Sequence, residues 1–488
     1  MVTMMLAAMD STIVSTAIPE IVGDLGGFSL FTWVFSVYLL TQTVTIPVYG
    51  KLADQYGRKP VLMIGILIFL AGSAASAGAW NMVSLVVFRA FQGLGAGAIM
   101  ATVNTLAGDL FSIRERARVQ GWLSSVWGLS AVIAPALGGA FAEYASWRWI
   151  FLVNLPIGAA SLLLLGRFLH ETLEKRRHRI DFAGAVLVLA TVGALVFGLL
   201  QGGEVWPWLS VPSVIVFALV VVLAAATVWV ERRAAEPVMP GWLWRRRVLA
   251  GSNLAMVGMG IVMMGPIAYL PTFAQSVFGL GAIAAGFILA VMSIGWPLAS
   301  SLSGRVYRTI GFRDTALGGA VLMIFAAVGF IALPYPGQIW AVVLDQMAFG
   351  AGFGLLSTPL LVGIQSVVGW EQRGVVTGAN MFARYLGQSL GAALFGAIFN
   401  PALAAQLEAA PAALQKHLPN TLDHVIRALH NTSSNHAAAS FLRHAIYTAT
   451  HHIYVAIAVV AVLTLVCVLI APRRFPLVDS QDRQVGHR

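Results

Sequence analysis

The chain has 488 residues, of which 58% are hydrophobic and only 10% are charged, and its formal net charge is +10. Because soluble proteins carry about 25% charged residues, this composition excludes a soluble enzyme, a nucleic-acid-binding protein and a disordered protein. The apolar runs last about 20 residues, the length of a helix that crosses a bilayer, whereas the strands of a membrane barrel alternate over about 10 residues. The chain is therefore expected to be an all-α polytopic membrane protein.

Fourteen apolar segments follow one another along the chain, and nearly all of them are joined by short loops. Each segment is expected to form one membrane-spanning helix. In chain order, the predicted spans cover residues 1–22, 30–52, 60–79, 82–108, 119–143, 149–168, 182–200, 211–230, 249–278, 282–304, 315–334, 338–368, 374–402 and 450–471.

Lys and Arg residues are distributed unevenly between the two sets of loops. If the N-terminus is cytoplasmic, 24 of the 30 fall in inside segments and four in outside segments, while Arg89 and Arg384 lie within spans. Because short cytoplasmic loops are enriched in Lys and Arg, both termini are expected in the cytoplasm, and the membrane is expected to be the bacterial inner membrane. The first span lacks a basic region before it and is interrupted by Asp10, so no cleavable signal peptide is expected.

Two sequence features occur twice. The loop 50–59, after the second span, and the stretch 304–313, after the tenth, each begin with a glycine that recurs seven residues later. A Gly-x-Gly-x-Gly triplet lies at 93–97 in the fourth span and again at 350–354 in the twelfth. Neither triplet follows a strand, so we interpret both as close helix packing rather than nucleotide binding. No Gly-x-x-x-x-Gly-Lys-Ser/Thr sequence occurs, which argues against ATP as the energy source.

These repeats divide the chain into two similar halves. Residues 1–170 are expected to form an N-terminal six-helix half, and 248–471 a C-terminal six-helix half that includes an extracytoplasmic segment. The linker 171–247 adds two further helices, and 472–488 form a cytoplasmic tail. Two repeated halves around a central site are a common plan of secondary transporters.

Several short runs resemble motifs of one known family. They are the loop Gly50–Lys59, the run Arg89–Gly93, Asp10–Val14 followed by Ala17–Pro19, Trp147–Phe151 followed by Asn154–Gly158, and Arg384–Gly387 leading to Gly391. By their residues and by their order along the chain, the five runs together resemble the major facilitator superfamily, and within it the 14-helix drug:proton antiporters of the EmrB/QacA type. The resemblance covers nearly the whole chain and implies a major facilitator fold with two inserted linker helices.

The resemblance also suggests roles for two groups of residues. The loop would act as a gating motif through Gly50, Asp54, Gly57, Arg58 and Lys59, with Asp54 as a latch near a helix N-terminus; the alternative is a solvated turn. An antiporter motif in the fifth span would comprise Gly128, Pro135, Gly138 and Gly139. This chain departs from that motif at Ala134, where the family usually has glycine.

Four ionisable residues stand out well inside predicted spans, where charge is costly and marks a functional candidate. Asp10 lies about 13 Å from the inner face and Arg89 about 12 Å from the outer face at 1.5 Å per helical residue. In a core about 30 Å thick the two could therefore meet near the midplane. The depths of Asp345 and Arg384 also match to within about one helical turn.

The chemistry expected of these four residues is proton coupling. A carboxyl whose Arg partner or water access changes can bind and release a proton, whereas Arg stays charged and can only tune it. The alternative is that Asp10 and Arg89 form a fixed ion pair between the first and fourth spans. Asp345 could instead bind a cationic substrate.

Polar, aromatic and Met side chains on the spans are candidates for a substrate cavity, because Met and aromatic groups adapt to varied apolar ligands. Plain helix packing is the alternative for each of them. The candidates are Trp33, Tyr38, Gln42, Asn104, Trp127, Asn253, Met256, Met259, Met263, Trp296, Asn380, Met381 and Gln388.

The segment 403–449 is the one long outside region. Leucines and other apolar residues recur within it at helical spacing, which predicts an amphipathic helix. The segment contains five of the ten His residues, but their spacing does not place two ligands on adjacent turns, and Cys467 is the single cysteine, so no metal site is expected. A docking surface for a periplasmic adaptor or for the membrane surface is the preferred interpretation.

Together these features predict a proton-driven exporter of hydrophobic or amphipathic small molecules, a multidrug efflux antiporter working by alternating access. It would not be an enzyme, would need no cofactor, and would have protons and the bilayer as partners, with no nucleic acid. One alternative is a dedicated exporter of a native lipid, siderophore or metabolite. Another is a non-transporting membrane sensor or scaffold, since fold alone does not fix function.

Overall fold

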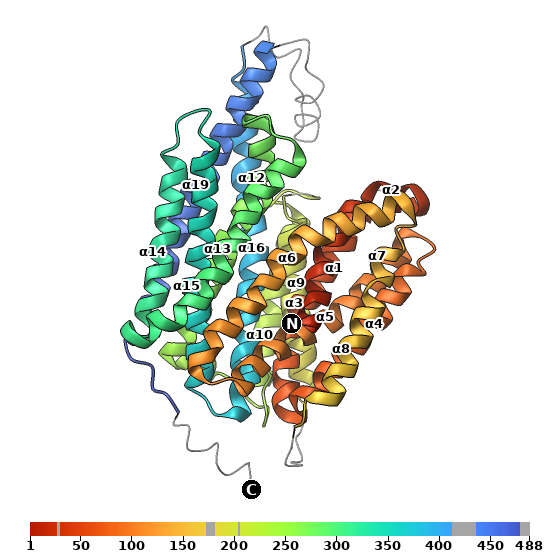
Figure 1. Ribbon diagram of the computed structural model, residues 1–488, viewed down its shortest axis with the longest axis vertical. Coiled ribbons are helices and arrows are strands. Elements are labelled where there is room, and N and C mark those ends of the chain that lie inside the picture. Colours follow the sequence, from red (N-terminus) through yellow and green to blue (C-terminus); the bar gives the residue numbers. More distant parts are fainter. Residues whose placement is uncertain (27–29, 172–180, 204, 412–435, 479–488) are drawn as a thin grey trace.

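The computed structural model describes residues 1–26, 30–171, 181–203, 205–411 and 436–478 (Figure 1). In these ranges the chain is almost entirely helical, and the one β-bridge joins Gly202 and Trp206. The described helices make fourteen passes in the predicted order, which agrees with an all-α polytopic membrane protein with a major facilitator fold.

The first six passes lie before residue 170. Their elements are α1 (Val2–Ile13), the 3-10 helix η1 (Val14–Ala17) and α2 (Ile18–Leu25), then α3 (Phe31–Tyr56), α4 (Arg58–Ala77), α5 (Met82–Leu110), α6 (Ile113–Tyr144), α7 (Trp149–Leu152) and α8 (Asn154–Phe168). The first pass is interrupted at η1, and Pro19 lies in the first turn of α2. A proline is tolerated there because the backbone N–H groups of a first helical turn have no hydrogen-bond partner within the helix.

The linker and the second half supply the other eight passes. Their elements are α9 (Phe182–Gln201), α10 (Val211–Glu231), the short α11 (Trp242–Arg245), α12 (Arg247–Val277), α13 (Ala282–Ile310), α14 (Phe312–Ile331), α15 (Ile339–Ser366), the 3-10 helix η3 (Trp370–Gln372), α16 (Arg373–Glu408) and α19 (His436–Ile470). Several helices exceed their predicted spans: α6 begins before 119, α13 continues beyond 304, α16 continues beyond 402, and α19 begins before 450. Hydropathy marks only the apolar part of a helix, whereas backbone hydrogen bonds can continue through polar residues.

Eleven helices in the described ranges are long and apolar enough to cross a membrane by themselves. The passes made by α1–α2, α3 and α6 are not among them. The first is interrupted, α3 carries Thr-Gln-Thr-Val-Thr at 41–45, and α6 begins with Arg114, Glu115 and Arg116. Polar groups inside a membrane bundle are tolerated where they face other helices.

The repeated glycine triplets pack helices in the same way in both halves. On α5, Gly97 packs against α3: a Cβ atom added to this glycine, as in alanine, would lie only 2.8 Å from the carbonyl oxygen of Gln42. Gly95 packs in the same way against α4, at Gly65. On α15, Gly354 meets α13 at 2.6 Å from the carbonyl oxygen of Trp296, and Gly352 meets α14. The packing interpretation of both triplets is therefore confirmed.

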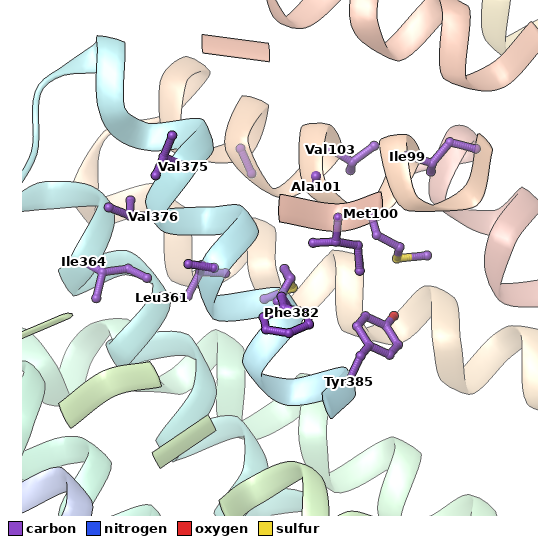
Figure 2. Close-up of a cluster of buried hydrophobic side chains, with 14 of the residues drawn as sticks. Ile99, Met100, Ala101, Val103, Leu361, Ile364, Val375, Val376, Phe382 and Tyr385 are labelled. Atoms are coloured by element: carbon purple, nitrogen blue, oxygen red, sulfur yellow. The ribbon is translucent and has the colours of Figure 1, made fainter. Parts of the chain in front are cut away.

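The two halves touch closely at one end of the molecule. There α3 lies against α16, and an added Cβ on Gly50 would lie 2.5 Å from the carbonyl oxygen of Gly374. Figure 2 shows an apolar cluster shared by the halves, to which Ile99, Met100 and Val103 on α5 and Val376 and Phe382 on α16 belong. In Figure 1 the helices of the two halves converge toward this end and diverge toward the other.

The linker helices α9 and α10 pack on each other, and α9 also contacts both α3 and α16. One face of α9 packs into the apolar cluster shared by the halves, through Val188, Val192 and Val196. Only 6% of the apolar window of α10 is buried, so this helix faces the lipid. The linker is thus attached along the line where the two halves meet.

Candidate functional site

Asp10 and Arg89 meet inside the first half, as their matching depths suggested. Both side chains are fully buried, and Arg89 Nη1 donates to Asp10 Oδ2. The guanidinium also lies 4.2 Å from the centre of the Tyr38 ring, and Arg89 Nε donates to the carbonyl oxygen of Val34 at 3.3 Å. The pair thereby joins α1, α3 and α5.

Three further residues complete this cluster, and no role was assigned to them from the sequence. Gln92 Nε2 donates to Asp10 Oδ1 at 2.8 Å, and Asn154 Nδ2 donates to the same oxygen at 3.1 Å and to Ser73 Oγ at 3.0 Å. Gln92 and Asn154 stand in the runs that carry the family resemblance, which was the available signal. Both oxygens of Asp10 are therefore hydrogen-bonded, while Arg89 Nη2 has no hydrogen bond within the described part of the chain.

Asp345 and Arg384 are not paired with each other. On α15, Asp345 Oδ2 accepts from Gln346 Nε2 at 2.9 Å, while Asp345 Oδ1 is buried without a hydrogen bond. On α16, the Arg384 guanidinium lies 5.0 Å from the ring of Tyr385 and 5.8 Å from the ring of Trp296. Among the described residues, no cation forms an ion pair with Asp345.

A small central cavity of about 40 Å³ lies between the halves. This volume holds water, but it is well below the roughly 300–1,000 Å³ of a drug-sized pocket. The cavity is lined by Met4, Asn104, Gln120, Leu123, Ser124, Trp127, Trp296, Ser357, Thr358, Leu361, Met381 and Arg384. Of the cavity candidates from the sequence, Asn104, Trp127, Trp296 and Met381 are thus brought together around Arg384.

The other cavity candidates lie elsewhere. Met256 and Met259 are fully buried in the apolar core of the second half, as the packing alternative supposed. Six further candidates are placed as follows: Tyr38 lies under Arg89, Gln42 is buried on α3, Asn253 accepts a hydrogen bond from Asn380 at 3.3 Å, and Met263 lies beside Gln388. Trp33 lines a different cavity, between α3, α9 and α16.

Asp54 connects the halves at their closed end. Its Oδ1 accepts from the backbone N–H of Gly374 and its Oδ2 from that of Val375, both at 2.8 Å. These N–H groups belong to the first turn of α16, where the helix dipole favours a negative charge. Arg58 Nη2 also donates to Asp54 Oδ1, at 2.7 Å. Asp54 is 8% exposed, so the description of this residue as a solvated turn does not fit.

Three residues not selected from the sequence extend this contact. Arg58 Nε donates to Asp109 Oδ2 at 2.8 Å, and Arg373 Nη1 donates to Asp109 Oδ1 at 3.0 Å. The Arg58 guanidinium also stacks 3.7 Å from the ring centre of Trp370. We call Asp54, Arg58, Asp109, Trp370 and Arg373 the Asp54 cluster. In this cluster each acidic side chain contacts basic or N–H groups, and the contacts run from the first half to the second.

Two other members of the loop motif shape the turn between α3 and α4. Gly57 has φ +96°, a left-handed conformation that favours glycine. Lys59 Nζ donates to the carbonyl oxygens of Gly166 and Leu169 at the end of α8. In the repeated stretch Gly311 has φ +94°, but the link across the halves is made there by Tyr307 OH, which donates to the carbonyl oxygen of Ile113.

The antiporter motif lies on α6, facing α13 in part. An added Cβ on Gly128 would lie 2.9 Å from the carbonyl oxygen of Ser293, which allows the two helices to approach closely. Gly138 is buried, and Gly139 has open space around its Cα. The side chain of Pro135 lies outside the described residues.

Asp24, at the end of α2, lies outside the predicted first span and at the end opposite the Asp54 cluster. Its Oδ2 accepts from Trp147 Nε1 at 3.0 Å and from Arg148 Nη1 at 2.7 Å. These two hydrogen bonds, from Trp147 first and Arg148 second, hold the pKa of Asp24 below its usual value. The contact fastens α2 to the start of α7.

The predicted amphipathic helix of segment 403–449 falls largely on residues 412–435, outside the described residues, and its docking role stays a prediction. In the described part of the chain, no group of three or more His, Cys, Asp or Glu side chains could hold a metal ion.

These features define a multi-pass helical membrane protein whose two halves enclose buried charged clusters. A family model described as Major Facilitator Superfamily matches residues 1–392. The chain belongs to this superfamily and is a transporter rather than an enzyme.

Relatives named as efflux proteins resemble most of the chain. Multidrug resistance protein 3 of Bacillus subtilis (strain 168) is 35% identical over 399 residues, covering 81% of this chain and 77% of the relative. The multidrug transporter protein MdtP of the same organism is 34% identical over 399 residues, covering 82% and 74%. Efflux pump FUS6 of Gibberella moniliformis is 34% identical over 411 residues, covering 82% and 72%.

Two solved structures share the fold. The human organic anion transporter MFSD10 superimposes with a TM-score of 0.62 at 13% identity, covering 96% of this chain and 98% of that one. The proton:xylose symporter XylE gives a TM-score of 0.56 at 13% identity, with coverages of 95% and 92%. At this identity the likeness concerns the fold alone.

Proposed function

We propose that this protein is a proton-coupled antiporter that exports hydrophobic or amphipathic compounds, as a multidrug efflux transporter of the bacterial cytoplasmic membrane. Both termini, and therefore the Asp54 cluster, would face the cytoplasm. The observation that carries the proposal is the charged Asp54 cluster, which joins the halves at one end only. The names of the relatives support multidrug compounds as the substrate class.

The Asp54 cluster would act as the latch of the cytoplasmic gate. Asp54 comes from α3 of the first half and binds the N-terminus of α16 in the second, so opening this end must break both backbone hydrogen bonds. Hydrogen bonds to a charged group contribute about 1.5–3 kcal/mol each, enough to bias a two-state equilibrium strongly toward the conformation closed at this end.

Asp345 would carry the coupling proton in this conformation. Its carboxyl is buried, one oxygen has no hydrogen bond, and no described cation pairs with it. Burying an unpaired carboxylate is costly, whereas a protonated carboxyl can remain. Reorientation of the halves would then expose this group to the other side for proton release, while Asp10 stays bound to Arg89.

The proposal is tested by transport in proteoliposomes with an imposed pH gradient. Purified protein is reconstituted, and uptake of ethidium, a cation, and of N-phenyl-1-naphthylamine, which is uncharged, is followed with and without the gradient. Accumulation that requires the gradient and collapses with a protonophore is expected for both compounds. Downhill movement unaffected by the gradient would contradict proton coupling.

The latch has a matched control on the same end of the molecule. Asp54→Asn removes the charge that α16 binds, and we expect transport to fall at least about tenfold, because about 1.4 kcal/mol already shifts a population tenfold. Asp314 also forms ion pairs at this end, with Arg313 and Arg473, but none of the three belongs to the first half. Asp314→Asn should therefore transport normally, and equal losses in both variants would remove the latch role.

The same assay separates the alternative functions. An exporter of a single native lipid, siderophore or metabolite would move neither test compound yet respond to the gradient with its own substrate. A sensor or scaffold would bind compounds without moving them. Either outcome would contradict multidrug export.

A further inference from the structure

A second cavity, of about 610 Å³, lies where α3, α16 and the end of α9 meet. This volume falls within the roughly 300–1,000 Å³ of small-molecule pockets, unlike the central cavity of about 40 Å³. Trp33 and Ser36 place it near the start of α3, about 31 Å along the helix from Asp54 at 1.5 Å per residue. It is therefore separate from the central cavity and from the Asp54 cluster.

Two indole rings, those of Trp33 and Trp208, line this cavity, and other aromatic rings pack behind them. Trp33 lies 5.7 Å from Phe197, and Phe197 lies 5.9 Å from Trp206, measured between ring centres. Trp208 stacks with Phe217 at 6.4 Å. Trp33 and Trp208 both line the cavity, so a flat aromatic molecule bound there would have two indole rings to contact. Contacts between aromatic rings add to the affinity that the burial of apolar area provides.

The turn after α9 contains two glycines against which the Trp208 ring packs. A Cβ on Gly202 or Gly203 would lie 2.6 Å from the Trp208 ring, and Gly203 has φ +81°. Two glycines here allow the indole to lie directly against the backbone. The part of the cavity wall that the linker contributes is thus closely packed against its own backbone.

Among the described residues, the polar groups around the cavity are few and uncharged. Gln201, Asn400 and Ser36 are the polar side chains that line it, and each described lining residue is neutral. Beside it, the buried Nε1–H of Trp206 has no acceptor. The central cavity differs, because it contains the cation Arg384. A ligand of this second cavity should therefore be uncharged.

We propose that this cavity, called the seam pocket (Trp33, Trp208, Gln201, Gly202, Gly396 and Asn400), is a binding site for an uncharged aromatic amphipathic molecule. Its walls come from the first half, the linker and the second half, so a bound molecule touches all three parts. The role in transport rests on the proposed function: a compound held between α3 and α16 at this end stabilises the conformation in which the two helices meet at Gly50 and Gly374. The inserted linker thereby becomes part of a ligand site.

The test measures binding, so it needs no gradient and no transport. Full-length protein in phosphatidylglycerol/phosphatidylethanolamine nanodiscs is titrated with N-phenyl-1-naphthylamine by equilibrium dialysis, with empty nanodiscs as the blank. Gly396→Leu places a side chain in the pocket, since an added Cβ there meets only Tyr269 OH, at 3.8 Å. The matched control is Gly329→Leu on α14, where an added Cβ has open space and no pocket.

The expected result is a loss of affinity of at least about tenfold in Gly396→Leu and in Trp208→Ala, with wild-type affinity in Gly329→Leu and Trp208→Phe. Ethidium affinity should be the same in all of them. Unchanged N-phenyl-1-naphthylamine binding in Gly396→Leu, or an equal loss in Gly329→Leu, would overturn the seam pocket. A phospholipid that co-purifies with wild type but not with Gly396→Leu, and that the dye cannot displace, would assign the pocket to lipid instead.

Two further outcomes sharpen the conclusion. Glu204 stands in the sequence between Gly203 and Val205, so Glu204→Gln is measured as well. Competition by ethidium that disappears in this variant would overturn the uncharged ligand class. If the dye binds as expected but the transport assay detects no gradient-driven export, the seam pocket stands and the proposed function fails.

Discussion

Two buried carboxyl groups, Asp10 in the first half and Asp345 in the second, show how differently the halves treat an acid in the membrane. Asp10 is hydrogen-bonded on both oxygens by Arg89, Gln92 and Asn154. Asp345 receives one hydrogen bond, from the neighbouring Gln346, and its other oxygen receives none.

The repeated glycine triplets explain part of the difference. They align Gln346 with Arg89, so the second half has a neutral amide where the first has a guanidinium. A fully paired acid behaves as a structural contact between helices. A buried acid without a cation favours the protonated form and can release its proton when water reaches it, which is why we propose Asp345 as the proton carrier.

The largest effect is expected from breaking the paired acid. Asp10→Ala leaves Arg89 charged and buried without its partner, and removal of one member of a buried pair costs about 3–5 kcal/mol. Thermal unfolding of the purified protein in detergent, followed by intrinsic fluorescence, should show this loss. Asp10→Asn/Arg89→Gln should recover most of it, whereas a single mutant as stable as wild type would contradict the structural role of the pair.

A smaller loss is expected at the rim of the same cluster. Asn154→Leu removes a donor to Asp10 and to Ser73 and leaves Ser73 Oγ and one Asp10 oxygen with fewer partners, which should cost about 1–3 kcal/mol. Unfolding of this variant is compared with that of Ser161→Ala on the same helix, whose hydroxyl pairs with Thr3 outside the cluster. An Asn154→Leu loss equal to that of Asp10→Ala would mean that Asn154, and not the ion pair, holds the helices together.

The smallest stability change is expected at Asp345. Asp345→Asn replaces a carboxyl that lacks a cation with a neutral group of the same shape, so the free energy of unfolding should change by less than about 1 kcal/mol. Gradient-driven export should nevertheless fall at least about tenfold, while exchange down a substrate gradient persists. If Asp345→Asn lost as much unfolding free energy as Asp10→Ala, or exported substrate uphill at the wild-type rate, the proposed difference between the two acids would be contradicted.

Much of the fold follows from local patterns in the sequence. Apolar runs predicted the fourteen passes, and the recurrent triplets at 93–97 and 350–354 predicted close packing, because Gly lets neighbouring backbones approach whatever else surrounds them. Matching depths predicted the meeting of Asp10 and Arg89, since position along a helix fixes height in the bilayer. The ends of α16 and α19 were less well predicted, because a helix continues beyond its apolar part.

Other features depended on the tertiary structure. The resemblance suggested a latch near a helix N-terminus, but nothing in the loop 50–59 specifies that this helix is α16, some 320 residues away, or that Asp109 and Arg373 extend the contact. The sequence could not separate Trp127 and Trp296, which line the central cavity, from Met256 and Met259, which fill the core, because all four have the same helical spacing and apolar character. Hydropathy and spacing act within one helix, whereas the partners of a side chain depend on how distant helices are placed against each other.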